Sequence, residues 1–342
     1  MGSADLANLS DKLMVTTVVL YIIAMIGYAA DLGFGRRRAA APAVAQPKAK
    51  VLAGAGGGGR VETDADAPAD GAPADAGQEE GGRDWGRFAV LLNVLGWAAH
   101  LGVLLTRGLA GERWPWANMY EFLTAIAFAA VTAYLVCLWK FRARFLGAFV
   151  MIAAVMALGA ANIWLYNEVG PVRPALNSYW IAIHVSAAII ATGAFTIGGV
   201  ATILYLLKAP REARGVVETG FWSHFPAAAG LDRLALRVTM FAFPIWTAAI
   251  VMGAIWADEA WGRYWGWDPK EIWSFITWVV YAAYLHARAT AGWKGRKAAI
   301  LSLIAFAALL FNFFGVNYMF KGKHSYAAPE HSVVQTHTTS LT

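Results

Sequence analysis

Tryptophans and histidines are the side chains of this sequence whose types and spacing could do chemistry. The stretch "WGRYWGWDPKEIW" (Trp261–Trp273) holds four of the 16 tryptophans, and Trp256 and Trp278 flank it. An aromatic belt at a membrane interface would spread its rings over all the helix ends, whereas these rings crowd one loop. The pattern favours a platform for a large, flat, apolar ligand, because offset stacking on such a ligand is favourable and orientation-selective. The predicted platform consists of Trp261, Tyr264, Trp265 and Trp267.

The letters "DPKE" in the same stretch have a local explanation that needs no ligand. Asp268 is a favoured N-cap, Pro269 suits the first helical position, and Glu271 stands at N3 to complete a capping box. We therefore expect a helix to begin here. For Asp268 this structural role is at least as well supported as direct chemistry.

Two histidines lie on the same predicted side as the tryptophans. His184, in "SYWIAIHVSAAI", stands about 8 Å below the outer end of a predicted helix. His324, in "NYMFKGKHSY", follows the outer end of the last predicted helix. A lone histidine on an apolar helix is usually a hydrogen-bonded structural residue, but these two converge on an aromatic platform. Two imidazoles and a flat macrocycle make a bis-histidine haem site, and we interpret the pair in this way.

Two further histidines are predicted within the membrane. His286 lies roughly 25 Å down the helix that begins at Pro269, and His100 lies about 18 Å from the inner end of its helix. Ionisable side chains inside a membrane are candidates for function. At the helical rise of about 1.5 Å per residue, their depths in the membrane differ by about 13 Å. This is too far for the two histidines to be the axial ligands of one iron. Either another subunit supplies a second ligand to His286, or the predicted helix ends are wrong; the role of His100 stays open.

The elements that position these residues are membrane-spanning helices. Hydrophobic residues make up 58% of the 342 and charged residues only 15%, which excludes an ordinary soluble domain. The composition predicts an all-α polytopic integral membrane protein with about eight transmembrane helices. The apolar runs near the length of a bilayer crossing are 13–34, 88–106, 119–139, 145–163, 179–207, 238–257, 272–288 and 299–319.

The basic residues predict the orientation of these helices. Alternate connecting segments, 35–87, 140–144, 208–237 and 287–298, carry 20 of the 28 Lys and Arg residues and are expected to be cytoplasmic. Both termini and the tryptophan stretch then lie outside. The net charge of +6 follows from these loops and needs no nucleic acid.

The chain divides into four predicted parts. Residues 1–35 form an N-terminal transmembrane helix, and residues 36–84, rich in Ala, Gly, Pro and Asp, form a disordered cytoplasmic linker. Residues 85–326 form a seven-helix domain that carries the histidines and tryptophans, and residues 327–342 form a flexible external tail. The single Cys137 can form no internal disulfide.

Five segments resemble a known family. The stretch "GAIWADEAWGRYWGWDPKEIWSFITWVVYAAYLHAR" resembles the tryptophan-rich WWD segment of the CcsA/ResC family, the cytochrome c synthesis proteins of system II, whose bacterial members are often labelled CcsB. The segments "PWANMYEF", "PALNSYWIAIHV", "LDRLALR" and "FNFFGVNYMFKGKHSY" are similar to family segments in the family order. The resemblance covers about 90–326. The long segment before the second helix departs from the family pattern.

The resemblance implies roles for particular residues. His184 and His324 match the two external haem ligands, and His286 matches the transmembrane histidine. The WWD motif is matched by Trp261, Trp265, Trp267 and Asp268, and the expected haem-binding set also includes Tyr264, Trp256 and Trp273.

The resemblance further implies the activity of a holocytochrome c synthase (cytochrome c haem lyase). Haem b would be delivered to the outer face of a bacterial plasma membrane and attached by thioether bonds to the CxxCH motif of apocytochrome c. A ResB-type membrane partner would complete the complex.

Three other functions are alternatives to a cytochrome c synthase. A dihaem b-type electron-transfer protein would need two histidine pairs at matched depths, which the sequence lacks. A haem exporter without synthase activity would share the same haem sites. A proton-coupled transporter would need carboxylates near the midplane of its helices, and none of the eight predicted spans has one there.

Overall fold

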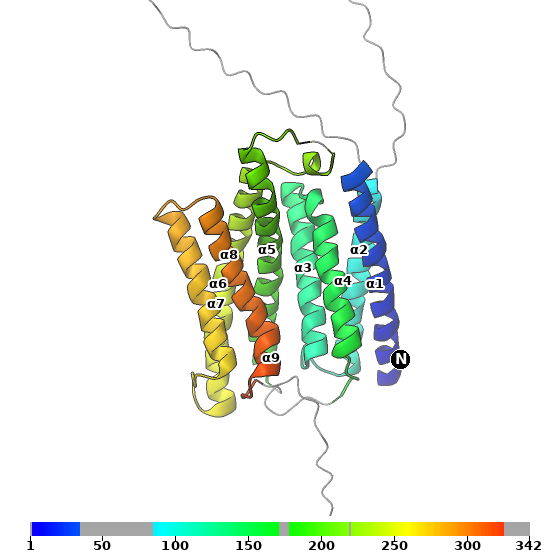
Figure 1. Cartoon of the computed structure of the whole chain (residues 1–342). Helices are drawn as coiled ribbons and strands as arrows, with labels where there is room; N and C mark the ends of the chain where they lie inside the picture. The colour runs from blue at the N-terminus through cyan, green and yellow to red at the C-terminus, as the bar shows by residue number, and fades with distance from the viewer. Residues whose placement is uncertain (1, 35–84, 171–177, 219, 325–342) are drawn as a thin grey trace, which may run out of the picture. The chain divides into compact units, whose positions relative to one another are not determined.

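The computed structural model of the chain describes residues 2–34, 85–170, 178–218 and 220–324, and these ranges are helical (Figure 1). The helices are α1 (Ser3–Phe34), α2 (Trp85–Ala110), α3 (Met119–Phe141), α4 (Gly147–Trp164), α5 (Ser186–Ala213), α6 (Ala228–Trp261), α7 (Pro269–Ala289), α8 (Arg296–Leu310) and α9 (Val316–Met319). Two short 3₁₀ turns, η1 (Arg144–Leu146) and η4 (Gly220–His224), join them. Two π turns, η3 (Ile181–Val185) and η5 (Phe311–Gly315), run directly into α5 and α9.

Seven helices in the described ranges are long and apolar enough to cross a membrane. The predicted fold class, an all-α polytopic membrane protein, is therefore confirmed. Helix α7, with 21 residues, is the eighth expected segment and lies outside this set of seven, because its aromatic, histidine and charged residues lower its hydropathy. The side of the membrane on which each terminus lies stays a prediction.

The division of the chain into four parts stays a prediction. Helix α1 occupies most of 1–35, and α2 to α9 fall within 85–326. The predicted linker 36–84 and tail 327–342 lie outside the described residues.

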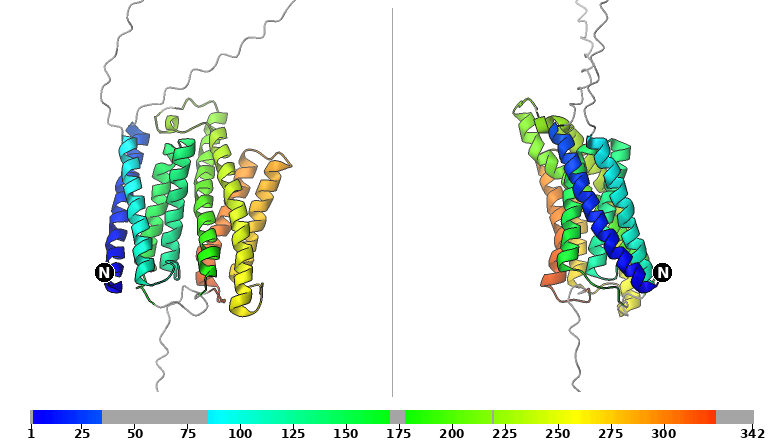
Figure 2. Two further views of the ribbon diagram at one scale, coloured as in Figure 1. Left: turned by 180° about the vertical axis from the view of Figure 1, so that it is seen from behind. Right: turned by 90° about the vertical axis from the view of Figure 1, so that its right-hand side faces the viewer.

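Neighbouring helices pack in a simple order. Helix α1 packs against α2 and α4, α3 packs against α4 and α5, and α5 packs against α6 and α8. Helix α7 packs against α6 and α8. Figure 1 and the turned views of Figure 2 show α1 and α2 at one edge of the helices and α6, α7 and α8 at the other. The α6–α7 connection, the start of α5 and the end of α9 lie together at one end (Figure 1).

Helix α1 is joined to α2 by a buried polar contact. The Tyr21 hydroxyl lies 3.2 Å from Nδ1 of His100, and both side chains are fully buried. The ring of Phe128 on α3 meets the His100 ring edge at 5.4 Å. His100 is therefore placed as a packed, hydrogen-bonded residue between α1, α2 and α3.

Helices α3 and α5 approach closely at one glycine. A Cβ added at Gly193 would lie 2.6 Å from the backbone carbon of Ala129. Backbone cannot move aside as a side-chain tip can, so the absence of a side chain sets the distance between the two helices.

We predict that Gly193→Ala destabilises the protein by about 1–3 kcal/mol, the usual cost of overpacking. Thermal unfolding of the detergent-solubilised chain checks this. The matched control is Gly159→Ala in α4, where an added Cβ meets nothing within 4 Å; it should leave the melting temperature unchanged or raise it. A Gly193→Ala variant as stable as this control would contradict the close approach.

Candidate functional site

A cavity of about 160 Å³ lies where η3, α6, α7, η5 and α9 meet. We call it the histidine cavity, because His184 and His324 both line it. Its aromatic and polar lining includes Trp116, Trp256, Trp261, Tyr264, Trp265, Lys270, Glu271, Asn312 and Asn317. Side chains from both ends of the WWD-like segment and from two distant histidine segments are thus brought to one place.

His184 stands in the π turn η3. Its Nδ1 lies 2.8 Å from the carbonyl oxygen of Ala249 on α6; a carbonyl only accepts, so Nδ1 carries the proton and Nε2 carries the lone pair. Gly253 lies against the ring, and a Cβ there would be 2.6 Å from Cε1 of His184. The imidazole is therefore held from α6 by one hydrogen bond and one glycine.

His324 follows α9 and is oriented by a carboxylate. Its Nδ1 donates to Oδ1 of Asp268 at 2.9 Å, and the ring of Trp261 meets it edge to face at 4.9 Å. Because Nδ1 is bound to the carboxylate, Nε2 is the ring nitrogen with which His324 could ligate a metal. Gly322 lets the backbone of this loop approach Asp268, since an added Cβ would clash with its Oδ2.

Asp268 is also the N-cap of α7, as its sequence context predicts. Its side chain accepts from the backbone N–H of Lys270 at 3.1 Å, and Oε2 of Glu271 accepts from the backbone N–H of Asp268 at 3.0 Å. The capping box is complete. A third donor, the backbone N–H of Lys323, binds Oδ2 of Asp268 at 2.7 Å. One carboxylate thus caps α7 and holds the loop that carries His324.

The pKa of Asp268 reflects these contacts. Burial raises it, but the hydrogen bonds from His324 and from the backbone N–H groups of Lys323 and Lys270 outweigh burial and lower the pKa from 3.8 to about 2. The group is therefore an anion throughout the physiological range.

The aromatic residues of the WWD-like segment divide into two sets. Trp261, Tyr264 and Trp265 line the histidine cavity together with Trp256. Trp267 is 67% exposed and is absent from the lining given by the described residues. Its φ of 57° lies in the left-handed region, a strained conformation for a tryptophan.

Trp273 and His286 lie elsewhere on α7. The Trp273 ring packs against Phe311 with centroids 4.3 Å apart. His286 is exposed in the last turn of α7, at the opposite end from Asp268. Neither belongs to the described lining of the histidine cavity, so the structure does not bring His286 together with His184 and His324.

Trp116, in the family-like segment "PWANMYEF", is a residue of the cavity that the sequence does not predict. It lines the histidine cavity, and its Nε1–H donates to the carbonyl oxygen of Ile181 at 3.2 Å. Ile181 is the first residue of η3, so this bond ties the α2–α3 connection to the turn that carries His184.

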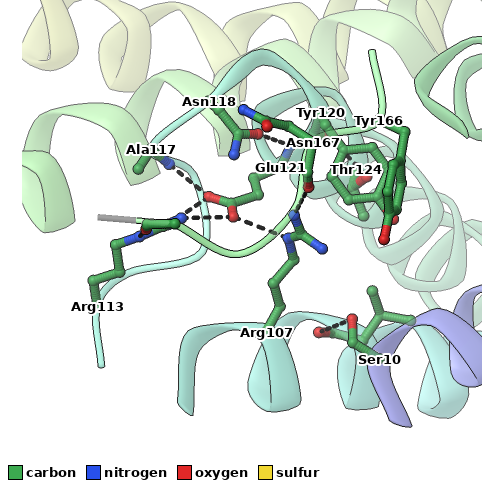
Figure 3. A network of polar contacts seen from close by, with 12 residues as sticks. Ser10, Arg107, Arg113, Ala117, Asn118, Tyr120, Glu121, Thr124, Tyr166 and Asn167 are labelled. Atoms are coloured by element: carbon green, nitrogen blue, oxygen red, sulfur yellow. Dashed lines mark hydrogen bonds and ion pairs between the residues drawn. The ribbon is translucent and has the colours of Figure 1, made fainter. Parts of the chain in front are cut away.

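A buried carboxylate fixes the α2–α3 connection (Figure 3). Glu121 is fully buried and accepts from Nε of Arg107 at 2.9 Å and from Arg113 at 2.6 Å. It also accepts from the backbone N–H of Ala117 at 2.9 Å, while Asn118 caps α3 through the Glu121 N–H. Two arginine side chains and one backbone N–H thus hold Glu121 in place.

The fold and the site define a class: a multi-pass helical membrane protein with two oriented histidines in an aromatic cavity at one end. Residues 116–324 match the family described as Cytochrome C assembly protein. The chain belongs to this cytochrome c assembly protein family, which gives it a role in cytochrome c maturation.

Similar proteins agree with this family. The cytochrome c biogenesis protein CcsA of Guillardia theta is 34% identical over 241 residues, which cover 66% of this chain and 80% of that protein. The CcsA protein of Gloeobacter violaceus is 33% identical over 298 residues, which cover 70% and 88%.

A solved structure shares the fold. The cytochrome c haem lyase CcmF superposes with a TM-score of 0.58 at 17% identity, covering 92% of this chain and 47% of CcmF. The chain thus spans about half the length of CcmF, and at this identity the likeness concerns the arrangement of helices.

We predict that Asp268→Ala lowers the free energy of unfolding by about 1–2 kcal/mol through loss of the cap. Asp268→Asn, which keeps a capping side chain, should lose less. Thermal unfolding in detergent measures both. Asp258→Ala in α6, which removes a carboxylate from outside this network, is the matched control and should change little.

The same carboxylate predicts a pH dependence. Because its pKa falls from 3.8 to about 2 on folding, the stability that it contributes is complete above pH 3.8 and is lost as the pH falls through about 2. The stability difference between the wild type and Asp268→Asn should therefore shrink as the pH falls from 3.8 through about 2. A difference that does not shrink over this range would show that the carboxylate is not held as described.

Proposed function

We propose that this chain is the haem-binding membrane subunit of a cytochrome c synthase. It holds haem b between His184 and His324 at the outer face of a bacterial plasma membrane and presents it to apocytochrome c for attachment. The observation that carries this proposal is the pair of imidazoles in one aromatic cavity, each with Nδ1 bound to an acceptor of the protein.

The donor set suits haem iron. Metal-ligating histidines commonly donate their second ring nitrogen to a carbonyl or a carboxylate, which fixes the tautomer and the ring direction. His184 uses the Ala249 carbonyl and His324 uses the Asp268 carboxylate. Among the described residues, no group of three or more His, Cys, Asp or Glu side chains could hold a bare metal ion. In haem, the porphyrin supplies four nitrogen ligands to the iron, so the protein needs to supply only the two axial ligands.

The aromatic lining would position the ring for its reaction. Trp261, Tyr264 and Trp265 offer flat faces for the macrocycle. In thioether formation a cysteine S–H adds across a haem vinyl group: sulfur bonds to one vinyl carbon and the proton goes to the other. No oxidant is consumed, so the contribution of the protein is to hold the vinyl groups near the two thiols of the CxxCH motif.

His286 has a separate proposed role. It stands exposed at the other end of α7, where it could ligate haem on its way from the inner side of the membrane if another subunit supplies a second ligand. A ResB-type membrane partner would be the source of that ligand. The release step at the outer site would follow when the histidine of the CxxCH motif replaces His184 or His324.

The arrangement of the described histidines argues against an electron carrier. A dihaem cytochrome b needs two matched pairs, but His100 is packed against Tyr21 and Phe128 and His286 is exposed on α7. A haem exporter without synthase activity would use the same cavity. An assay of covalent haem attachment to apocytochrome c distinguishes it from a synthase.

We predict that the purified chain carries haem with a low-spin bis-histidine spectrum. His184→Gly and His324→Gly should each abolish that spectrum, because each removes one axial ligand. His224→Gly, in η4 at the other end of α5, is the control and should keep it. A spectrum unchanged by both ligand substitutions would refute the assignment, and a chain without haem in any preparation would refute the proposal.

Deletion of the protein should abolish covalent c-type haem in the cell, while haem b in other proteins persists. Haem staining of denaturing gels measures covalent attachment directly. Normal levels of c-type cytochromes in the deletion strain would refute the proposed synthase function. Loss of attachment restored by the wild-type chain, but not by His324→Gly, would support it.

A further inference from the structure

Lys270 is a basic residue in the histidine cavity that none of the steps above uses. It is the second residue of α7, is half-buried and lines the cavity with both histidines. Its Nζ donates to the carbonyl oxygen of Asn312 at 2.7 Å and to Oδ1 of Asn317 at 3.2 Å. It also lies 5.2 Å from the ring centroid of Phe313. These partners are all neutral.

The nearby carboxylates are engaged with other groups. Asp268 accepts from Nδ1 of His324 and from backbone N–H groups. Oε2 of Glu271 accepts from the backbone N–H groups of Gly266 and Asp268. Within the part of the chain that the structure describes, no carboxylate oxygen forms an ion pair with Nζ of Lys270. Neutral acceptors satisfy two of its three donors. Burial lowers the pKa of Lys270 to about 7, although the charge of Asp268 raises it, so an anion bound at the third donor would stabilise the charged form.

A backbone irregularity holds this ammonium in place. Asn312 belongs to the π turn η5, and its carbonyl oxygen accepts from Lys270 instead of serving only the helix. Its side chain donates to Oγ of Ser274 at 3.1 Å, and Ser274 Oγ donates to the Lys270 carbonyl at 2.7 Å. The α7–η5 wall therefore holds the amine of Lys270 at a fixed position in the cavity.

We propose that the Lys270 ammonium binds a propionate carboxylate of the haem that His184 and His324 ligate, an inference that rests on the proposed function. Haem b carries two propionates on one edge and its vinyl groups toward the opposite edge. A propionate is the anionic group of this ligand, and a hydrogen bond between two charged groups is roughly twice as strong as a neutral one.

The contact would orient the macrocycle. Two axial histidines fix the iron but allow the ring to turn about the line between them. A propionate bound at the α7–η5 wall removes that freedom and turns the vinyl edge away from Lys270. Lys270 is in this sense a positioning residue for attachment.

The test compares two ligands on the full chain in detergent: haem b, and haem b dimethyl ester, whose propionates are uncharged. Soret titrations give the dissociation constants. The wild type should bind haem b more tightly than the ester. Lys270→Met should weaken haem b binding about tenfold or more, the scale of a lost charged hydrogen bond, and should change ester binding less than about twofold.

The controls separate orientation from folding. Lys270→Arg keeps the charge and should keep the preference for haem b, while Lys321→Met, an exposed lysine near the site, should leave both affinities unchanged. If Lys270→Met lowers the affinities for haem b and for the ester equally, the role of Lys270 is structural and the inference is overturned. A wild type that binds the ester as tightly as haem b would overturn it without any variant.

Failure of this inference is distinct from failure of the proposed function. If the bis-histidine spectrum forms with both ligands but neither the wild type nor Lys270→Met discriminates between them, only the role of Lys270 is lost. If no bis-histidine spectrum forms, the proposed function itself fails.

Discussion

The carboxylate of Asp268 is the interaction on which the geometry of the site depends. It satisfies the first turn of α7, binds the backbone at Lys323 and accepts from the His324 ring. The start of α7 and the loop of Lys323 and His324 are separated by more than fifty residues of sequence, and one buried anion holds them together. Because its ionised form accepts from all three donors, loss of the charge would loosen a helix start and a histidine together. A substitution here is therefore expected to affect folding and ligand geometry at once.

Much of the architecture follows from local rules that the sequence displays. Lengths of apolar runs place the helices, and the order of Asp, Pro and Glu in "DPKE" places the start of α7 at Asp268, as the structure confirms. Helix depth alone puts His184 and His324 at the end where the tryptophans lie. In each case the deciding interaction joins residues within a few positions or follows from the thickness of a bilayer.

Features that depend on distant contacts could not be predicted in the same way. The partner of His100 is Tyr21, on a helix 79 positions earlier, and Trp116 joins the cavity through a bond to Ile181. The predicted span 238–257 is shorter than α6, which begins at Ala228, because packing extends a helix beyond its apolar run. The outward position of Trp267 follows from a left-handed backbone that composition does not reveal.

The two π turns have a consequence for how this site could change. Each turn contains one residue more than an α-helical turn would, and one residue corresponds to a rotation of about 100° around a helix axis. Deleting one residue from η3 would restore a regular helix and rotate the segment before the deletion relative to α5. The same deletion in η5 would rotate α9 and the His324 loop relative to α8. The two histidines are thus set by helical register, and a single codon lost in either turn would dismantle the pair while leaving the apolar faces of the remaining helices intact.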